Sequence, residues 1–361
     1  MSVKHYYVSG NTSQGFFSLF DSVVETINHL YLIKGDSLRA KSELLDEVGL
    51  SYEKKGYQVD YYHSPHHQKR REGVRIKALR LAFFDEALAQ HSALDHRSKL
   101  KEIVNLNDDI NQKHFSKVKE KVEQLVDERQ YQYKEAYRLF SEAKQIHETK
   151  EDIYLSAMDF KKADKVAEKL IDVIYKQVPP KSGHGEVEEI FFGAATPMGA
   201  ENFIDSLTAD VKKRYIIKGR SGSGKSTLMR KVAEPALERG YSLTYFLCGL
   251  DPDSLDMIII DELNLAILDG TSPHVIDPSR KHDEVVDMFE LCIDPSVEEK
   301  EKKRIKACEM IYKEKMKHGT ARLKKAAEIQ DVIDAYLEEI ASETERIIRK
   351  EGFVQKLPGL A

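Results

Sequence analysis

The amino-acid sequence contains a long internal repeat. Displaced by 184 residues, the chain matches itself without a gap from about Thr12 to Asp85. One fixed offset over so long a stretch indicates two copies of a single structural unit, each about half of the chain. The matched pairs include Thr12 with Thr196, Gly15 with Gly199, Tyr31 with Tyr215, Lys41-Ser42 with Lys225-Ser226, and Asp85 with Asp269.

Composition places the boundary between the copies. The chain of 361 residues exceeds the size at which one hydrophobic core stops growing, and residues 74–178 contain neither glycine nor proline. Residues 179–185, Pro-Pro-Lys-Ser-Gly-His-Gly, cannot continue a helix and predict a linker. We therefore expect domains over 1–178 and 186–361, each with an α/β head followed by a long helical arm.

Apolar stripes at helical spacing predict both arms. In the first arm the stripe runs from Val118 to Ile146, and in the second from Ala326 to Ile340. Such stripes are typical of a helical-hairpin core rather than of a groove for a partner. Between Glu298 and Lys325 the second arm carries eleven Lys and Arg against five Glu, a balance of +6. A solvated helix face is the favoured interpretation, with a phosphate-binding surface as the alternative.

One motif carries chemistry. The apolar segment Arg214 to Ile217 predicts a buried strand, and Gly219-Arg-Ser-Gly-Ser-Gly-Lys-Ser226 follows it with Thr227 behind. This is the complete pattern GxxxxGK[ST], placed between a strand and an amphipathic helix as the motif requires. The helix is expected to end at Gly240, kinked or shortened by Pro235.

The residue types of this motif suit a polyphosphate. Backbone N–H groups and a helix N-terminus meet dense negative charge, and glycines at 219, 222 and 224 permit the close approach. We expect Lys225 to reach the β- and γ-phosphates and Ser226 to ligate Mg²⁺, with ATP and Mg²⁺ as cofactors. The expected nucleotide-binding residues are Gly219, Arg220, Ser221, Gly222, Ser223, Gly224, Lys225, Ser226 and Thr227.

The first copy retains the spacing of the motif but lacks two of the glycines that phosphate binding requires. Leu38 and Ala40 stand where the second copy has Gly222 and Gly224. Their Cβ atoms are expected to crowd a phosphate cradle, and the carboxylate of Asp36 to repel an anion. We therefore interpret the first copy as a degenerate site that supports the second.

Two strands compete to supply the carboxylate on the magnesium side. Met257 to Ile260 precedes Asp261-Glu262, whereas Leu265 to Leu268 precedes Asp269. Only Asp269 is repeated in the first copy, as Asp85, so we favour Asp269 as a catalytic residue and metal ligand beside Ser226. Glu262, or Asp261, is then a candidate for orienting the attacking water; the alternative is that both are exposed turn acids.

Three weaker patterns remain. Thr271 and His274 leave the Asp269 strand and are either a contact to the γ-phosphate or acceptor, or a polar capped loop. His63, His66 and His67 have metal-like spacing, but their counterparts in the second copy include two leucines, so we discount a metal site. Residues 149–152, Thr-Lys-Glu-Asp, match a guanine-specificity pattern in letters alone, since they lie in a helical arm.

Composition narrows the class of protein. The net charge of −5 does not indicate a nucleic-acid binder, and apolar runs are too short to cross a bilayer. The first residues show no signal peptide, and Cys248, Cys292 and Cys308 form neither a metal motif nor a set of disulfide pairs. These features predict a cytoplasmic protein without a membrane partner. The sequence leaves open its oligomeric state and the molecule on which it acts.

The chain resembles a family of duplicated bacterial P-loop ATPases. The resemblance spans nearly the whole chain and rests on residues 219–226, 251–256 and 269–274. It implies two tandem P-loop NTPase-like domains with mostly parallel sheets, and nucleotide binding in the second. The leading hypothesis is Mg²⁺-dependent ATP hydrolysis coupled to movement of the helical arms. The alternatives are a kinase for a small molecule or nucleotide, whose residues 271–281 close over the acceptor, and a non-enzymatic nucleotide-binding scaffold.

Overall fold

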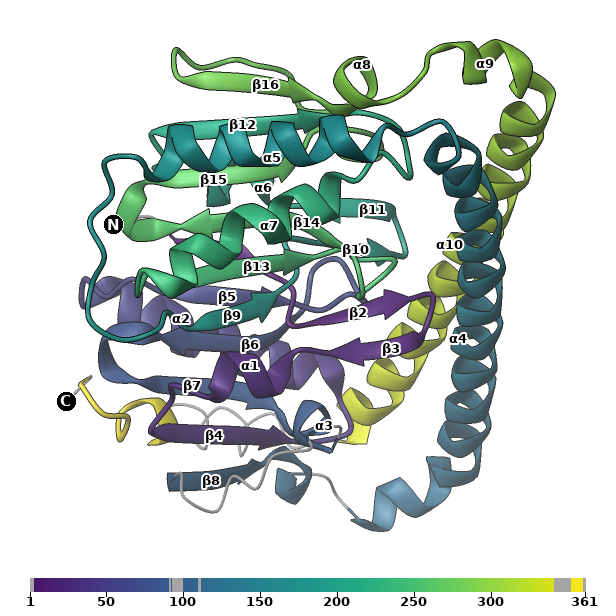
Figure 1. Cartoon of the computed structure of the whole chain (residues 1–361). Coiled ribbons are helices and arrows are strands. Elements are labelled where there is room, and N and C mark those ends of the chain that lie inside the picture. The colour runs from purple at the N-terminus through teal and green to yellow at the C-terminus, as the bar shows by residue number, and fades with distance from the viewer. Residues whose placement is uncertain (1–2, 91, 93–99, 110–111, 341–351, 360–361) are drawn as a thin grey trace.

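The computed structural model describes residues 3–90, 92, 100–109, 112–340 and 352–359, and contains two six-stranded sheets (Figure 1). In each sheet three neighbouring strand pairs are parallel and two antiparallel, so both sheets are mixed. The strand orders are β8-β4-β7-β6-β5-β1 and β16-β12-β15-β14-β13-β9. The α/β class expected from the sequence is confirmed.

The elements of the first half are β1 (Lys4–Tyr6), β2 (Ser9–Thr12), β3 (Gly15–Ser18), α1 (Phe20–Val24), β4 (His29–Lys34), α2 (Leu38–Lys54), β5 (Asp60–His63), β6 (Arg71–Ile76), β7 (Leu81–Asp85), α3 (Glu86–Ala89), β8 (Leu100–Asn105), α4 (Gln112–Leu155) and α5 (Phe160–Tyr175). The elements of the second half are β9 (Val187–Ile190), β10 (Gly193–Thr196), β11 (Gly199–Asn202), α6 (Ile204–Leu207), β12 (Lys213–Lys218), α7 (Lys225–Glu238), β13 (Leu243–Leu247), β14 (Leu255–Ile260), β15 (Leu265–Asp269), β16 (Asp283–Asp287), α8 (Met288–Cys292), α9 (Ser296–Lys300) and α10 (Lys302–Ile340).

The repeat in the sequence is a repeat in the structure. Strands β4, β6 and β7 correspond residue for residue to β12, β14 and β15 at the offset of 184. Irregular features repeat as well: the register shifts at Tyr62/His63 in one sheet and at Phe246/Leu247 in the other. Arg80 and Asn264 both have positive φ, at 49° and 50°. Backbone detail of this kind indicates that the two halves are built on one plan.

A shared core joins the two sheets. Side chains alternate between the faces of a strand, so Ile217 of β12 packs under α7 while Ile216 faces the other way. Ile216 there joins Leu30 and Leu32 of β4 in one apolar cluster that includes residues from both halves. The backbones also meet, because Tyr7 and Phe191 exchange hydrogen bonds of 3.0 and 3.1 Å. The two halves therefore bury apolar surface against each other.

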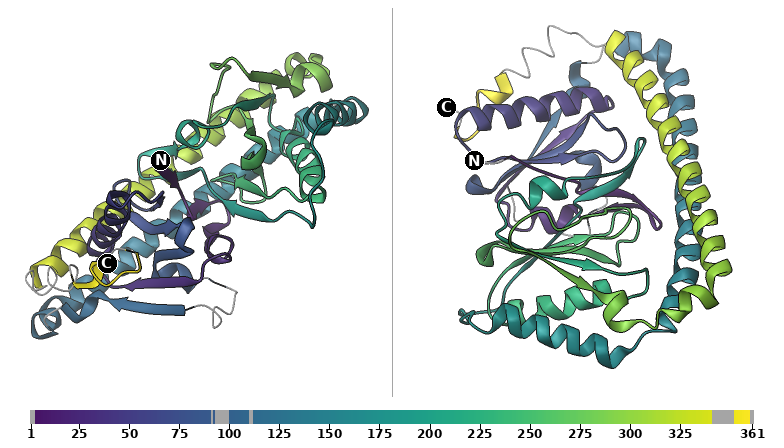
Figure 2. Two further views of the ribbon diagram at one scale, coloured as in Figure 1. Left: turned by 90° about the vertical axis from the view of Figure 1, so that its left-hand side faces the viewer. Right: turned by 90° about the horizontal axis from the view of Figure 1, so that it is seen from above.

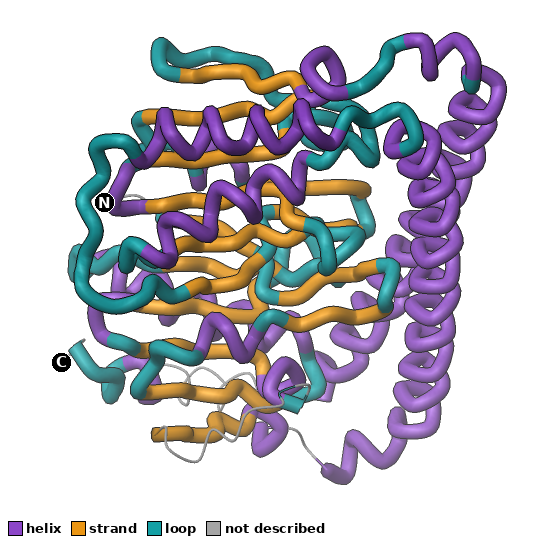
Figure 3. Tube along the Cα trace, in the orientation of Figure 1, coloured by secondary structure: helices purple, strands orange, loops and turns teal. Residues whose placement is uncertain are grey.

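The two long helices α4 and α10 pack side by side as an antiparallel pair (Figures 1 and 3). Apolar residues of α10, among them Ile333 and Leu337, pack against Val122 of α4. Polar pairs continue the contact, with Lys315 Nζ 2.6 Å from the Glu142 carboxylate. The stripes were expected to form a helical-hairpin core; instead they face each other across two helices of different halves, one from each arm. In the basic stretch, Lys302, Lys303 and Arg304 are exposed to solvent.

The segments that follow the arms cross between the halves. Helix α5, from the first half, packs on α7 of the second, and Tyr175 Oη donates a 2.8 Å hydrogen bond to the Val232 carbonyl. In return, residues 352–359 cover α2, where Tyr52 Oη donates to the Pro358 carbonyl at 2.7 Å (Figure 2). Each head is thus completed by a segment of the other half.

Two further expectations concern single elements. Helix α7 continues for three residues beyond Pro235 and ends at Glu238, so this proline does not end the helix where it stands. Among the helices of the described residues, none has the length and apolar character needed to span a bilayer.

Candidate functional site

The loop between β12 and α7 is shaped by three glycines. Gly219, Gly222 and Gly224 have φ values of 150°, 74° and 77°, in the left-handed region that side chains rarely adopt. A Cβ atom at Gly219 would lie 2.4 Å from Ser223 Oγ, and one at Gly222 would lie 2.5 Å from the Glu151 carbonyl oxygen. Only a sequence with glycine at these positions can therefore adopt this backbone conformation.

The loop ends at the N-terminus of α7. Leu228 donates a 2.8 Å hydrogen bond to the Gly224 carbonyl, so the N–H groups of residues 225–227 precede the first bonded turn. The positive end of the helix dipole lies at the same place. Lys225 Nζ donates to the Arg220 carbonyl at 2.9 Å and lies 3.5 Å from Asp269 Oδ2. Positive charge from backbone and side chain is thus gathered at this end of the sheet.

Asp269 lies beside the loop because β15 is the parallel neighbour of β12. In the register of these strands Asp269 is paired with Ile217, just before the glycine loop. Its Oδ1 accepts hydrogen bonds from the N–H of Thr271 at 2.8 Å and from Thr271 Oγ1 at 2.5 Å. Thr271 therefore orients the carboxylate that faces Lys225.

Ser226 lies on the same side, in the first turn of α7. Its Oγ accepts a 3.0 Å hydrogen bond from the N–H of Leu255, the first residue of β14. The same bond occurs in the first half, from Arg71 N–H to Ser42 Oγ at 2.8 Å. This contact fixes the serine against the strand that follows the 251–254 turn.

A second carboxyl group was not singled out from the sequence. Because β14 is antiparallel to β15 and Met257 pairs with Leu268, Asp256 lies at the same sheet edge as Asp269. Burial, and then the charge of Asp269, raise the pKa of Asp256 to about 7. Its counterpart at the repeat offset is Glu72. The presence of an acidic residue at this position in both copies could have identified Asp256 from the sequence.

Glu262 and Asp261 lie elsewhere. They belong to the 3-10 turn Asp261–Leu263 that precedes β15, at the end of the sheet where β12 begins. The length of β15, five residues at about 3.3 Å each, separates that end from Asp269. Glu262 pairs with Lys181 of the interdomain segment. The structure therefore brings Asp269 to Lys225 and does not bring Glu262 there.

The remaining predicted residues surround the loop in different ways. Arg220 Nε lies 2.7 Å from a Glu298 carboxylate oxygen, and the Arg220 guanidinium lies over the Phe289 ring at 4.9 Å. Ser223 is buried, and its Oγ has no hydrogen-bond partner within the described part of the chain. Thr227 is exposed, and Ser221 is half-buried.

His274 lies in the loop after β15. Its ring stands edge-on to Phe192, with centroids 4.9 Å apart, and burial lowers the pKa of the imidazole. Its Nδ1 lies 3.3 Å from Asn202 Nδ2. Of the two residues singled out in this loop, Thr271 contacts Asp269, and His274 contacts Asn202 and Phe192.

The corresponding loop of the first half is a helix. Helix α2 begins at Leu38, whereas α7 begins at Lys225, the counterpart of Lys41. Residues 38–40 are therefore helical, and Ser37 caps them by accepting a 3.1 Å hydrogen bond from the Ala40 N–H. We expected side chains to crowd a preserved cradle; instead the cradle is replaced by a helical turn. Lys41 remains, 2.6 Å from Asp85 and buried.

The two patterns discounted in the sequence have other structural settings. His63 Nδ1 faces Arg71 at 2.9 Å, and His66 lies between the Phe16 and Tyr133 rings. In the described ranges no group of three or more His, Cys, Asp or Glu side chains is arranged to hold a metal ion. Residues 149–152 lie within α4, with no strand before them.

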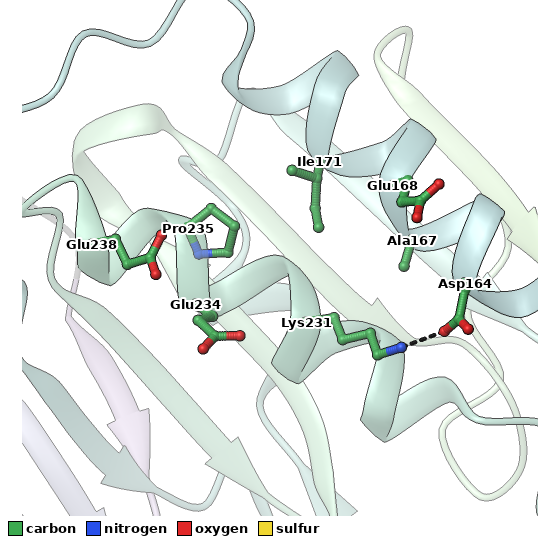
Figure 4. A pocket seen from close by; sticks show the side chains of 8 residues that line it. All are labelled: Asp164, Ala167, Glu168, Ile171, Lys231, Glu234, Pro235 and Glu238. Atoms are coloured by element: carbon green, nitrogen blue, oxygen red, sulfur yellow. Dashed lines mark hydrogen bonds and ion pairs between the residues drawn. The ribbon is translucent and has the colours of Figure 1, made fainter.

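A groove lies between α5 and α7 (Figure 4). Its apolar floor is rimmed by four carboxylates and one lysine, and Lys231 is already paired with Asp164 at 2.5 Å. This excess of negative charge opposes a polyphosphate. The residues lining the groove are Asp164, Ala167, Glu168, Ile171, Lys231, Glu234, Pro235 and Glu238.

Comparison with known proteins adds no relative: no protein-family model matches the chain, and no curated protein or solved structure is similar to it.

Proposed function

We propose that the second half binds ATP with Mg²⁺ through residues 219–227 and hydrolyses it. The observation that carries the proposal is the glycine loop itself, with its three positive φ angles, opening onto the α7 N-terminus beside Lys225 and Asp269. Backbone N–H groups, a helix N-terminus and one ammonium group form a favourable environment for phosphate oxygens.

The residues at the sheet edge also fit a magnesium ion. Ser226 Oγ and the Asp269 carboxylate are hard oxygen donors of the kind that Mg²⁺ prefers, and they would hold it. Mg²⁺, when bound, neutralises charge on the phosphates. Lys225 binds and orients the phosphates, while Thr271 keeps the Asp269 carboxylate in place. Glu262 is left out of the proposal because it lies at the other end of β15.

The choice of ATP rests on the sequence, where no credible guanine motif is present. Titration calorimetry with ATP, GTP and ADP, each with Mg²⁺, tests it directly. We expect ATP to bind wild type and Lys225→Ala to bind about 100-fold more weakly, since a charged hydrogen-bond donor is lost. Lys231→Ala, which removes an equally charged group from the side of α7 that faces α5, is the matched control and is expected to bind like wild type.

Phosphate release measured alongside binding tests the hydrolysis. We expect release that requires Mg²⁺ and is lost in Lys225→Ala and in Asp269→Asn. Binding without release would leave the scaffold function in place of the ATPase. No binding of any of the three nucleotides, by a protein with the melting curve of wild type, would contradict the proposal altogether.

A further inference from the structure

The end of α4, an element of the first half, lies directly on the glycine loop of the second. Burial raises the pKa of the Glu151 carboxyl group, while the nearby Gly222 N–H and the charge of Lys225 act to lower it. A Cβ atom at Gly222 would lie 2.5 Å from the Glu151 carbonyl oxygen, and one at Gly224 2.9 Å from Met158 Cε. An arm carboxylate thus faces the loop amide and the ammonium group proposed to receive a phosphate.

The first half has the same contact, made by the other arm. Leu38 is the counterpart of Gly222 at the repeat offset, and its N–H donates a 3.0 Å hydrogen bond to Asp334 Oδ1 of α10. In both halves, therefore, a carboxylate from the opposite arm lies near the same loop amide. The recurrence makes a chance contact at Glu151 a poor explanation.

The two contacts differ in how firmly they are held. Asp334 is fully buried, lies 2.5 Å from Arg70, and accepts from Gln330 Nε2 at 3.2 Å. Arg70 has no counterpart in the second half, where Ser254 takes its place. The Glu151 side chain is 39% exposed, and His147 Nε2 lies 3.6 Å from it. The contact in the first half is locked, whereas the contact in the second is open to solvent.

We infer that the Glu151 carboxylate occupies the place of a phosphate oxygen in the resting protein, so that nucleotide binding and docking of the α4 end on the loop exclude each other. The inference rests on the proposed nucleotide binding. Its consequence is mechanical, because the end of α4 leaves the loop when a nucleotide enters, and α4 is packed along α10. In the first half, Arg70 and Gln330 keep the equivalent carboxylate in place.

Glu151→Gln tests this exclusion, with Glu148→Gln as its matched control. Glutamine keeps the size of the side chain but removes the negative charge that lies near the loop amide and Lys225. Glu148 lies on the same helix, is exposed, and has Lys144 3.7 Å away. We expect Glu151→Gln to bind Mg-ATP about tenfold more tightly than wild type, and Glu148→Gln to stay within about twofold, since a charge close to the phosphate position changes affinity on this scale.

The outcomes separate this inference from the proposed function. Equal affinity of the two variants, or weaker binding by Glu151→Gln, would overturn the inference while wild-type binding still supported the function. Absence of binding in wild type and in both variants would overturn both together. Thermal melts of the three proteins establish that they are equally folded.

Hydrogen exchange supplies a readout that affinity alone does not. Addition of Mg-ATP to wild type is expected to speed amide exchange in residues 147–155 at the end of α4. Residues 330–337 of α10, whose Asp334 stays on the first half, are expected to remain unchanged. Slower exchange at the end of α4 would show that the nucleotide holds the arm in place, contrary to the inference.

Discussion

Glu72 is buried and Asp256 is half-buried at matching positions, each near a lysine and an aspartate of its own half. The Ser9 hydroxyl donates a 2.7 Å hydrogen bond to Glu72 Oε1. Burial is the main cause that raises the pKa of Glu72 to about 8, with a contribution from the charge of Asp85; the hydrogen bond from Ser9 and the charge of Lys41 act in the opposite direction. The folded first half therefore retains a proton that an exposed glutamate would release.

This proton makes stability depend on pH. Between the ordinary glutamate pKa, near 4.5, and about 8, the folded chain holds the Glu72 proton and the unfolded chain does not. The free energy of unfolding thus falls by about 1.4 kcal/mol per pH unit from this group as pH rises through that window. Glu72→Gln lacks this dependence. Its free energy of unfolding, relative to that of wild type, is therefore expected to increase from pH 5 to pH 8.

Urea unfolding at pH 5, 6, 7 and 8 measures this difference. Glu123→Gln, which changes a glutamate that is 64% exposed on α4, is the control and should follow wild type at every pH. Parallel curves for wild type and Glu72→Gln would show that Glu72 is ionised in the folded protein throughout.

At the level of elements, a few residues decide whether the same segment is a loop or a helix. In the second half Gly222 and Gly224 have left-handed backbone conformations, and α7 begins only at Lys225. In the first half Leu38 and Ala40 are helical, so α2 begins three residues before Lys41, the counterpart of Lys225. The sequence predicted loss of the phosphate site in the first half, since side chains disfavour positive φ. It did not predict the helical turn, because capping by Ser37 and docking of Asp334 stabilise that alternative.

The long helices offer a test of close packing. Gly319 of α10 lies so near the ring of Phe140 on α4 that a Cβ atom would stand 2.4 Å from Phe140 Cε1. Alanine favours a helix over glycine by about 1 kcal/mol, but overpacking a buried contact costs about 1–3 kcal/mol. We expect Gly319→Ala to lower the free energy of unfolding in wild type.

A double-mutant cycle identifies the cause of that loss. In a Phe140→Leu background the ring is gone, so Gly319→Ala is expected to be neutral or stabilising there. Denaturant melts of the four proteins give the interaction energy. A stabilising effect of Gly319→Ala in wild type would show that the helices do not approach each other as closely as described.

At the scale of the whole molecule, the two halves are joined by segments that pack on the opposite half as well as by the linker between them. They share an apolar core, Arg75 of the first half pairs with Asp60 and with Glu188 of the second, and each head is covered by a segment from the other. Separating the halves would take Glu188 away from Arg75 and expose the shared apolar surface.

We therefore expect the full chain to unfold in one transition, with equal calorimetric and van't Hoff enthalpies. Fragments 1–178 and 186–361, produced separately, are expected to aggregate or remain unfolded and to assemble when produced together. Circular dichroism and sedimentation report the outcome. Two resolved transitions, or a folded monomeric half, would show that the shared core contributes little to stability.

The sequence by itself determined the α/β class and the repeated plan, and it singled out residues 219–226. These follow from local causes: a fixed offset of identities, alternating apolar residues, and glycines that alone tolerate left-handed backbone. Tertiary structure decided which carboxylates share the site. Asp256 reaches Asp269 through an antiparallel hairpin, Glu262 is carried to the far end of the same strand, and Glu151 arrives from the other half. Contacts between distant segments depend on how whole elements pack, and no local pattern of residues encodes that packing.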